Sequence, residues 1–238
     1  LESSPVGFNL LAWSAPISEK MHPIAERLKK IGYDGIECFI DYQDVAAYQQ
    51  FGNHLQQLGL KSTCVMVMSP DENPASESST IREQALTRLK DAIDRAQAMG
   101  ASVICGPFHS AFATFSRQEP QDAEYSRSAE VLNAAGEYAK QANIILTPEA
   151  INRFECYLCN TMAQLAELIR RADHPNVRAM FDTHHANIEE KRFPDALQTI
   201  APVLAHVHIS ENDRGTPGGG HIPWDDTFRT LAEINYNG

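Results

Sequence analysis

Acidic and imidazole side chains stand at or near the ends of three successive apolar segments. Glu149 and Asp182 each end one segment, and His206 and His208 lie in the third. The two histidines are two positions apart, so they would share one face of a strand. Two carboxylates and an imidazole that meet at one place could bind a divalent metal ion. Mixed oxygen and nitrogen donors favour Mn, Co, Zn or Mg over a metal that selects thiolates.

Each of these residues also has a purely structural interpretation. A carboxylate at the end of a strand can cap the next helix, which applies equally to Glu149 and Asp182. One strand-borne histidine can be a hydrogen-bonded core residue, and His208, nearer the carboxyl end, is the better ligand. His184 and His185 follow Asp182, and only one of them need belong to the site. The occurrence of possible metal ligands at all three segment ends favours the interpretation as a metal site.

Short apolar segments alternate with helical patterns along the whole chain. The predicted strands are 7–13, 35–40, 61–68, 103–107, 144–149, 177–182 and 204–210. The predicted helices are 18–31, 44–58, 80–99, 122–142, 161–172, 193–200 and 224–234. Thr80 with Glu83 and Thr161 with Gln164 have the spacing of capping boxes, which mark helix starts.

Seven strand–helix units without a change in composition predict an α/β fold, a (β/α)8 TIM barrel in one domain over residues 1–238. A doubly wound sheet would carry a glycine-rich phosphate loop after its first strand, whereas Ser-Ala-Pro stands there. The active site of such a barrel lies at the carboxyl ends of its strands. Arg153, Glu155 and Arg214 follow those ends, so they are either surface charges or groups that bind sugar hydroxyls.

The composition excludes several partner classes. The chain of 238 residues has 20 Lys and Arg against 31 Asp and Glu, a formal charge of −11. This charge argues against nucleic acid and anionic membranes as partners. No apolar run reaches the length of a membrane span, and no secretory signal pattern opens the chain. The five cysteines suggest reduced core thiols and a cytoplasmic protein, and Cys156-x-x-Cys159 is interpreted as incidental.

Four stretches together resemble one known family. They are GYDGIE at 32–37, PEAINRFE at 148–155, FDTHHANIEE at 181–190 and HVHISENDRGTPGGGHIPW at 206–224. In order and spacing, the chain resembles the xylose-isomerase-like sugar phosphate isomerase/epimerase family. Within that family it is most similar to the D-tagatose/D-psicose (allulose) 3-epimerases.

The resemblance implies roles for particular residues. Glu149 matches a glutamate that binds the metal and acts as acid and base, while Asp182 and His208 match further metal ligands. Substrate contacts fall to three other residues, Glu155, His185 and Arg214. The family's fourth ligand is a second glutamate on strand eight, which serves as the opposing acid/base and has no match in this sequence. The implied cofactor is a divalent metal ion, Mn²⁺ first, with Co²⁺, Mg²⁺ or Zn²⁺ as alternatives.

The implied activity is that of a metal-dependent sugar epimerase, a ketose 3-epimerase that removes the C3 proton through a metal-stabilised cis-enediolate. The alternative is a keto-sugar or inosose dehydratase, lyase or hydratase on the same barrel. A carbohydrate-binding protein on a degraded barrel is a third, non-enzymatic possibility. The expected partners are a small-molecule sugar and further copies of the chain, in a dimer or tetramer.

The last residues repeat an earlier pattern. Ile-Asn-Tyr-Asn-Gly at 234–238 is similar to Ile-Gly-Tyr-Asp-Gly at 31–35, after which a predicted strand begins. By analogy, strand eight is expected directly after Gly238, with the missing glutamate near its end. We therefore expect a C-terminally incomplete barrel that lacks one βα unit of ~25–40 residues. Such a chain would have a weakened metal site and little epimerisation.

Overall fold

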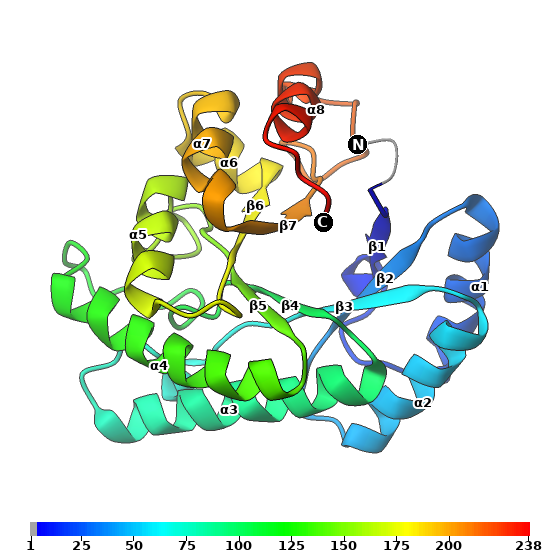
Figure 1. The fold of residues 1–238 in the computed structure, drawn as a ribbon, viewed down its shortest axis with the longest axis horizontal. Helices are drawn as coiled ribbons and strands as arrows, with labels where there is room; N and C mark the ends of the chain where they lie inside the picture. Colours follow the sequence, from blue (N-terminus) through cyan, green and yellow to red (C-terminus); the bar gives the residue numbers. More distant parts are fainter. Residues whose placement is uncertain (1–3) are drawn as a thin grey trace.

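The strands follow one another around an open barrel, and the helices lie on its outside (Figure 1). The structure is a computed structural model that describes residues 4–238. The strands are β1 Gly7–Asn9, β2 Gly35–Phe39, β3 Lys61–Val65, β4 Val103–Gly106, β5 Ile145–Pro148, β6 Ala179–Asp182 and β7 Leu204–His208. The helices are α1 His22–Ile31, α2 Val45–Gln57, α3 Ser79–Met99, α4 Asp122–Gln141, α5 Met162–Ala172, α6 Thr183–Glu189, α7 Phe193–Ile200 and α8 Trp224–Glu233.

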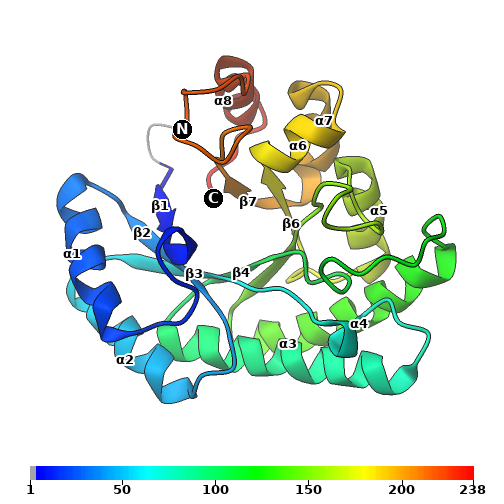
Figure 2. The same cartoon turned by 180° about the vertical axis from the view of Figure 1, so that it is seen from behind.

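All the strand pairs are parallel, and they form two sheets. Strands β1 to β5 pair in chain order, and β6 pairs with β7. Isolated bridges join the backbones near the two sheets, Leu146 with Val177 and Glu149 with Met180. Within residues 4–238, β1 pairs only with β2 and β7 only with β6, so the barrel is open between β7 and β1. The view from behind shows the same order of helices around the strands (Figure 2).

Of the two capping boxes predicted at helix starts, one is confirmed and one is wrong. Thr161 and Gln164 form the predicted capping box before α5. The predicted box at Thr80 is wrong, because Ser78 is the N-cap of α3 and Thr80 lies inside that helix. The first strand is shorter than predicted, because the Asn9 side chain accepts the N–H of Leu11 and starts a 3-10 helix over Leu10–Ala12.

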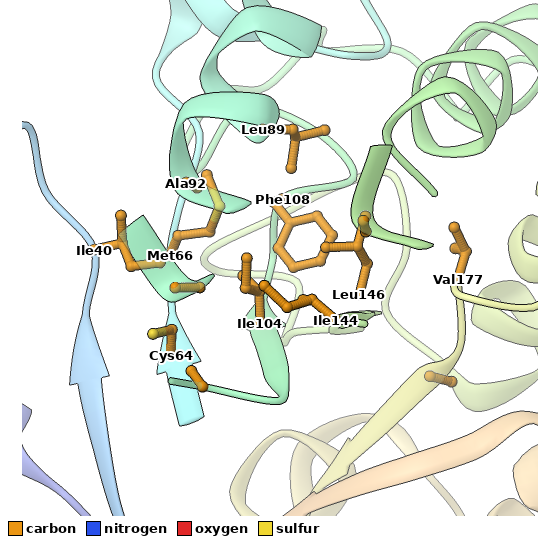
Figure 3. Packing of buried hydrophobic residues seen from close by; sticks show 14 of the residues in the cluster. Ile40, Cys64, Met66, Leu89, Ala92, Ile104, Phe108, Ile144, Leu146 and Val177 are labelled. Carbon is orange, nitrogen blue, oxygen red and sulfur yellow. The ribbon is translucent and has the colours of Figure 1, made fainter. Parts of the chain in front are cut away.

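A continuous apolar core lies between the helices and the strands (Figure 3). Leu89 and Ala92 of α3 lie over Met66 and Ile104, and all four side chains are fully buried. Burial of a large aliphatic side chain contributes about 1.5–3 kcal/mol each, so this layer fixes the strands against α3. The strand ends that carry the candidate site therefore stand on a rigid base.

Gly106 allows β3 and β4 to approach closely at the carboxyl end of the sheet. Its φ is +119°, and a Cβ there would lie 2.2 Å from the carbonyl oxygen of Met66. Only glycine fits such a position without strain. The Gly106 carbonyl then accepts the backbone N–H of Glu149 at 2.9 Å. This hydrogen bond fixes the position of the Glu149 backbone relative to the end of β4.

The turn after α8 repeats the turn after α1. The N–H of Tyr33 donates to the carbonyl of Leu28 at 3.2 Å, and the N–H of Tyr236 donates to that of Leu231 at 2.9 Å. Each tyrosine follows a residue with positive φ. The sequence similarity between the two segments is thus matched by their backbone. No helix within residues 4–238 combines the length and apolar character needed to cross a membrane.

Candidate active site

Glu149 is a buried carboxyl directly after β5. Its exposed fraction is 5%. Burial raises the pKa of Glu149 to about 8, and the negative charge of Asp182 adds to this effect. A carboxyl in this environment holds a proton that it can release when a cation arrives, and it can exchange a proton near neutral pH.

Asp182 ends β6 and caps α6 at the same time. Its Oδ1 accepts the backbone N–H of His184 at 2.7 Å and that of His185 at 3.4 Å. Burial acts to raise the pKa of Asp182, but a hydrogen bond from His208 and the charges of His185 and His208 hold it below its ordinary value. The capping and metal-binding interpretations of Asp182 are therefore compatible.

Ligand atoms of Glu149, Asp182 and His185 all lie within 4.8 Å of one another, close enough to surround one metal ion. His185 Nε2 is 3.7 Å from Glu149 Oε1. The structure thus brings together the two predicted carboxylate ligands. It adds His185, for which the resemblance implied a substrate contact.

His208, the third predicted ligand, ends β7 and faces two carboxylates. Its Nδ1 is 3.5 Å from Asp182 Oδ2, and its Nε2 is 2.7 Å from Glu37 Oε1. The structure groups it with Glu37, Cys105 and His206, whose ligand atoms lie within 4.8 Å of one another. His208 therefore lies next to the group of Glu149, Asp182 and His185, and its contact with that group is to Asp182.

Sequence reasoning missed the role of Glu37. It lies in the middle of β2 and is 4% exposed. Burial acts to raise the pKa of Glu37, but the charge of His208 and hydrogen bonds from His206 and His208 hold it well below its ordinary value. A carboxylate inside the apolar run Gly-Ile-Glu-Cys-Phe was the available signal, because buried charges are almost always paired.

His109 lies in the loop after β4 and is fully buried, with an exposed fraction of 0%. Its Nε2 is 2.9 Å from the carbonyl oxygen of Glu149. Burial lowers the pKa of His109 to about 4, so it stays neutral beneath the site.

The two remaining predicted residues, Glu155 and Arg214, meet on loops. Arg214 Nη2 lies 3.4 Å from Glu155 Oε1. The loop that carries Arg214 is organised by buried Glu211, whose carboxylate accepts the N–H of Gly218 at 2.8 Å and that of Ile222 at 3.0 Å. Arg153, by contrast, forms an ion pair with Glu189 at 2.7 Å.

Comparisons with known proteins match this architecture. Residues 25–238 match the model of the xylose isomerase-like TIM barrel family. The D-psicose 3-epimerase of Agrobacterium fabrum is 30% identical over 231 residues, 95% of this chain and 80% of that protein. The L-ribulose 3-epimerase of Mesorhizobium japonicum is 28% identical, over 97% of this chain and 78% of that protein.

Solved structures agree. The crystal structure of D-psicose 3-epimerase with D-tagatose from Clostridium cellulolyticum H10 superimposes with a TM-score of 0.91 at 27% identity, covering 98% of this chain and 82% of that one. The predicted barrel class and the predicted resemblance are both confirmed. The chain belongs to the xylose isomerase-like TIM barrel family.

Proposed function

We propose that the protein is a divalent-metal-dependent ketose 3-epimerase with Glu149 as its catalytic acid and base. The observation that carries the proposal is the pair Glu149 and Asp182, two buried carboxyls at neighbouring strand ends in a barrel whose relatives are named as ketose 3-epimerases. Burial, and after it the negative charge of Asp182, raises the pKa of Glu149, which is the behaviour of a site built to hold a cation.

The donor set fits a divalent metal ion. Glu149, Asp182 and His208 would supply two oxygens and one nitrogen, a mixture that suits Mn²⁺ and also Co²⁺, Mg²⁺ or Zn²⁺. We infer Mn²⁺ as the ion. When bound, such an ion supplies Lewis-acid polarisation of the ketose carbonyl, which makes the C3 proton more acidic.

The residues of the chain would then hold the sugar and move the proton. Glu149 would take the C3 proton from one face of the sugar as a general base. Inversion also requires an acid that returns a proton on the opposite face, the role that the resemblance gives to the strand-eight glutamate with no match in this sequence. His185 donates its Nε2–H to a sugar oxygen, and Arg214 and Glu155 bind hydroxyls from the loops above. The sugar is the small-molecule partner of the protein. The protein itself would be a cytoplasmic dimer or tetramer. The five unpaired and buried cysteines support a reducing compartment.

The test is proton exchange at C3. D-fructose, D-psicose, D-tagatose and L-ribulose are incubated in deuterated water with the protein and Mn²⁺, and again after EDTA. With Mn²⁺ we expect deuterium at C3 of at least one sugar, with little of the 3-epimer because the opposing acid/base has no match in this sequence, and with EDTA we expect no deuterium at C3. Glu149→Gln should abolish exchange, while Glu130→Gln on the exposed surface of α4 should not.

Two outcomes would contradict the proposal. One is a product lighter by one water molecule, which would identify a dehydratase. The other is the absence of C3 deuterium from every ketose in the presence of Mn²⁺.

A further inference from the structure

We propose that Glu37 is a positioning residue that holds His208 with Nδ1 turned toward the metal site. The inference rests on the metal site of the proposed function and concerns how one of its ligands is prepared. Glu37 belongs to β2, whereas His208 belongs to β7, so the contact spans the interior of the barrel.

The two nitrogens of the His208 ring face different partners. Nε2 lies 2.7 Å from Glu37 Oε1, a short hydrogen-bond distance, while Nδ1 lies 3.5 Å from Asp182 Oδ2. A carboxylate accepts hydrogen bonds and cannot donate them, so Nε2 must carry the proton. In the metal-free protein Nδ1 can donate to Asp182 as well, on the opposite side of the ring. A metal ion would displace that Nδ1 proton, and the lone pair it takes would then lie on the side of Asp182 and Glu149.

Glu37 is itself held in place from several directions. Oε1 accepts from Asn9 Nδ2 at 2.9 Å. Oε2 accepts from Thr63 Oγ1 at 2.9 Å and lies 3.0 Å from His206 Nε2. The side chain is 6% exposed, so water hardly competes for these bonds. The carboxylate is therefore a fixed acceptor, and the ring that it binds is fixed with it.

This arrangement has a known physical consequence for metal ligands. A histidine that donates its second ring N–H to a carboxylate keeps one tautomer and one ring orientation and becomes a more basic ligand. Loss of such a partner weakens metal binding by about 10- to 100-fold. Glu37 would thus act on the metal through His208, without touching the metal or the sugar.

The same residues could also be taken for a metal site of their own. Glu37, Cys105, His206 and His208 include the donor types of a tetrahedral zinc site. The contacts of Glu37 to both histidines are hydrogen-bond distances, at 3.0 Å and 2.7 Å, and Cys105 Sγ is 3.1 Å from Glu37 Oε2. We therefore assign the group to hydrogen bonding around His208, and the experiment separates the two possibilities.

The experiment measures metal binding and the protonation of His208 without any sugar. Mn²⁺ affinity is obtained from the free-ion electron paramagnetic resonance signal. The His208 ring is observed by ¹H–¹⁵N NMR in the Zn²⁺-loaded, ¹⁵N-histidine-labelled protein. In the unchanged protein we expect metal on Nδ1 and a slowly exchanging Nε2–H. In Glu37→Gln we expect the Mn²⁺ dissociation constant to rise about 10- to 100-fold and the Nε2–H signal to shift or broaden.

Control variants keep the result interpretable. Glu124→Gln alters another buried carboxyl, in the first turn of α4, and should leave both readouts unchanged. If Glu37→Gln does not fold, Thr63→Val removes one bond to Glu37 and should weaken Mn²⁺ binding to a smaller extent. An unchanged Mn²⁺ affinity and Nε2–H signal in a folded Glu37→Gln would overturn the proposal.

Two further results would also overturn it. One is metal bound through Nε2 of His208. The other is a thiolate-to-metal absorption band with Co²⁺ that disappears in Cys105→Ser, which would show that the Glu37 group binds the metal itself. Because no sugar is present, a protein that binds Mn²⁺ as described but does not epimerise would refute the proposed activity alone.

Discussion

The imidazole of His185 accepts a hydrogen bond from the backbone N–H of Asn152, with the two nitrogen atoms 3.0 Å apart. The acceptor is Nδ1, so the ring proton is on Nε2, which lies 3.7 Å from Glu149 Oε1. Burial lowers the pKa of His185 to about 4, although the charge of Asp182 opposes the shift. His185 is therefore a neutral donor aimed at the site.

Replacement of His185 by alanine should reduce turnover more than metal binding. The variant loses one hydrogen bond to the sugar, which corresponds to about 1.5 kcal/mol and roughly a tenfold loss in kcat/KM. Steady-state kinetics and Mn²⁺ titration would measure the two effects separately. His184→Ala is the matched control, because His184 Nδ1 faces the Glu211 carbonyl at 3.3 Å. Loss of Mn²⁺ binding in His185→Ala would instead make His185 a ligand.

Glu149 should make the metal-free protein less stable as the pH rises. The folded state keeps this carboxyl protonated up to about 8, whereas its ordinary pKa is 4.5. Between these values the unfolded state has released a proton that the folded state retains, so the free energy of unfolding falls with increasing pH. Urea unfolding in EDTA from pH 5 to pH 8 should show the decline.

Glu149→Gln removes this titration, so its stability relative to the unchanged protein should improve steadily toward pH 8. Glu130→Gln, an exposed change, should run parallel to the unchanged protein. Equal pH slopes for the unchanged protein and Glu149→Gln would show that Glu149 is ionised in the metal-free fold.

His109 should have the opposite effect at acid pH. Its pKa is about 4 in the fold against an ordinary 6.5, because the ring is buried. As the pH falls from 6.5 to 4, His109 binds a proton in the unfolded state but not in the folded state. The free energy of unfolding therefore decreases over that interval. His109→Gln can still donate to the Glu149 carbonyl, and its unfolding free energy should depend less on pH there. If the free energy of unfolding of His109→Gln depended on pH below 6.5 as strongly as that of the unchanged protein, His109 would not be the group responsible.

Metal binding should stabilise the fold and should depend on Asp182. At Mn²⁺ a hundredfold above its dissociation constant, the stabilisation is about 2.7 kcal/mol, or roughly 5–10 °C in Tm. Asp182→Asn retains a good cap for α6 but lacks the charge, so its Tm should not respond to Mn²⁺. Differential scanning calorimetry would measure both. A full Tm response in Asp182→Asn would exclude Asp182 as a ligand.

The sequence predicted strands and helices well where one signal repeats over many residues. The order of strands and of the long helices followed from their apolar periodicity. Helix α6 was missed, because Thr183–Glu189 is only seven residues long and contains two adjacent histidines instead of an apolar stripe. The box at Thr80 failed because a four-residue pattern is a weak signal, whereas the helix start is decided by the whole segment.

The candidate site was predictable at strand ends and unpredictable in strand interiors. Glu149, Asp182 and His208 could be found because barrel topology gathers the carboxyl ends of strands. Glu37 could not be linked to His208, since the contact joins residues 171 positions apart across the barrel. Such a contact depends on the curvature of the sheet, which no local pattern encodes.

The division between the two sheets falls in the middle of the candidate site. Glu149 follows the five-stranded sheet, while Asp182 and His208 belong to β6 and β7. Isolated bridges and the contacts of Glu37 with His206 and His208 connect the two sheets. A small sliding of one sheet along the other would change the spacing of the ligands without breaking a ladder within either sheet. We therefore expect residues that line this boundary to influence the spacing of the ligand atoms, and with it the metal affinity.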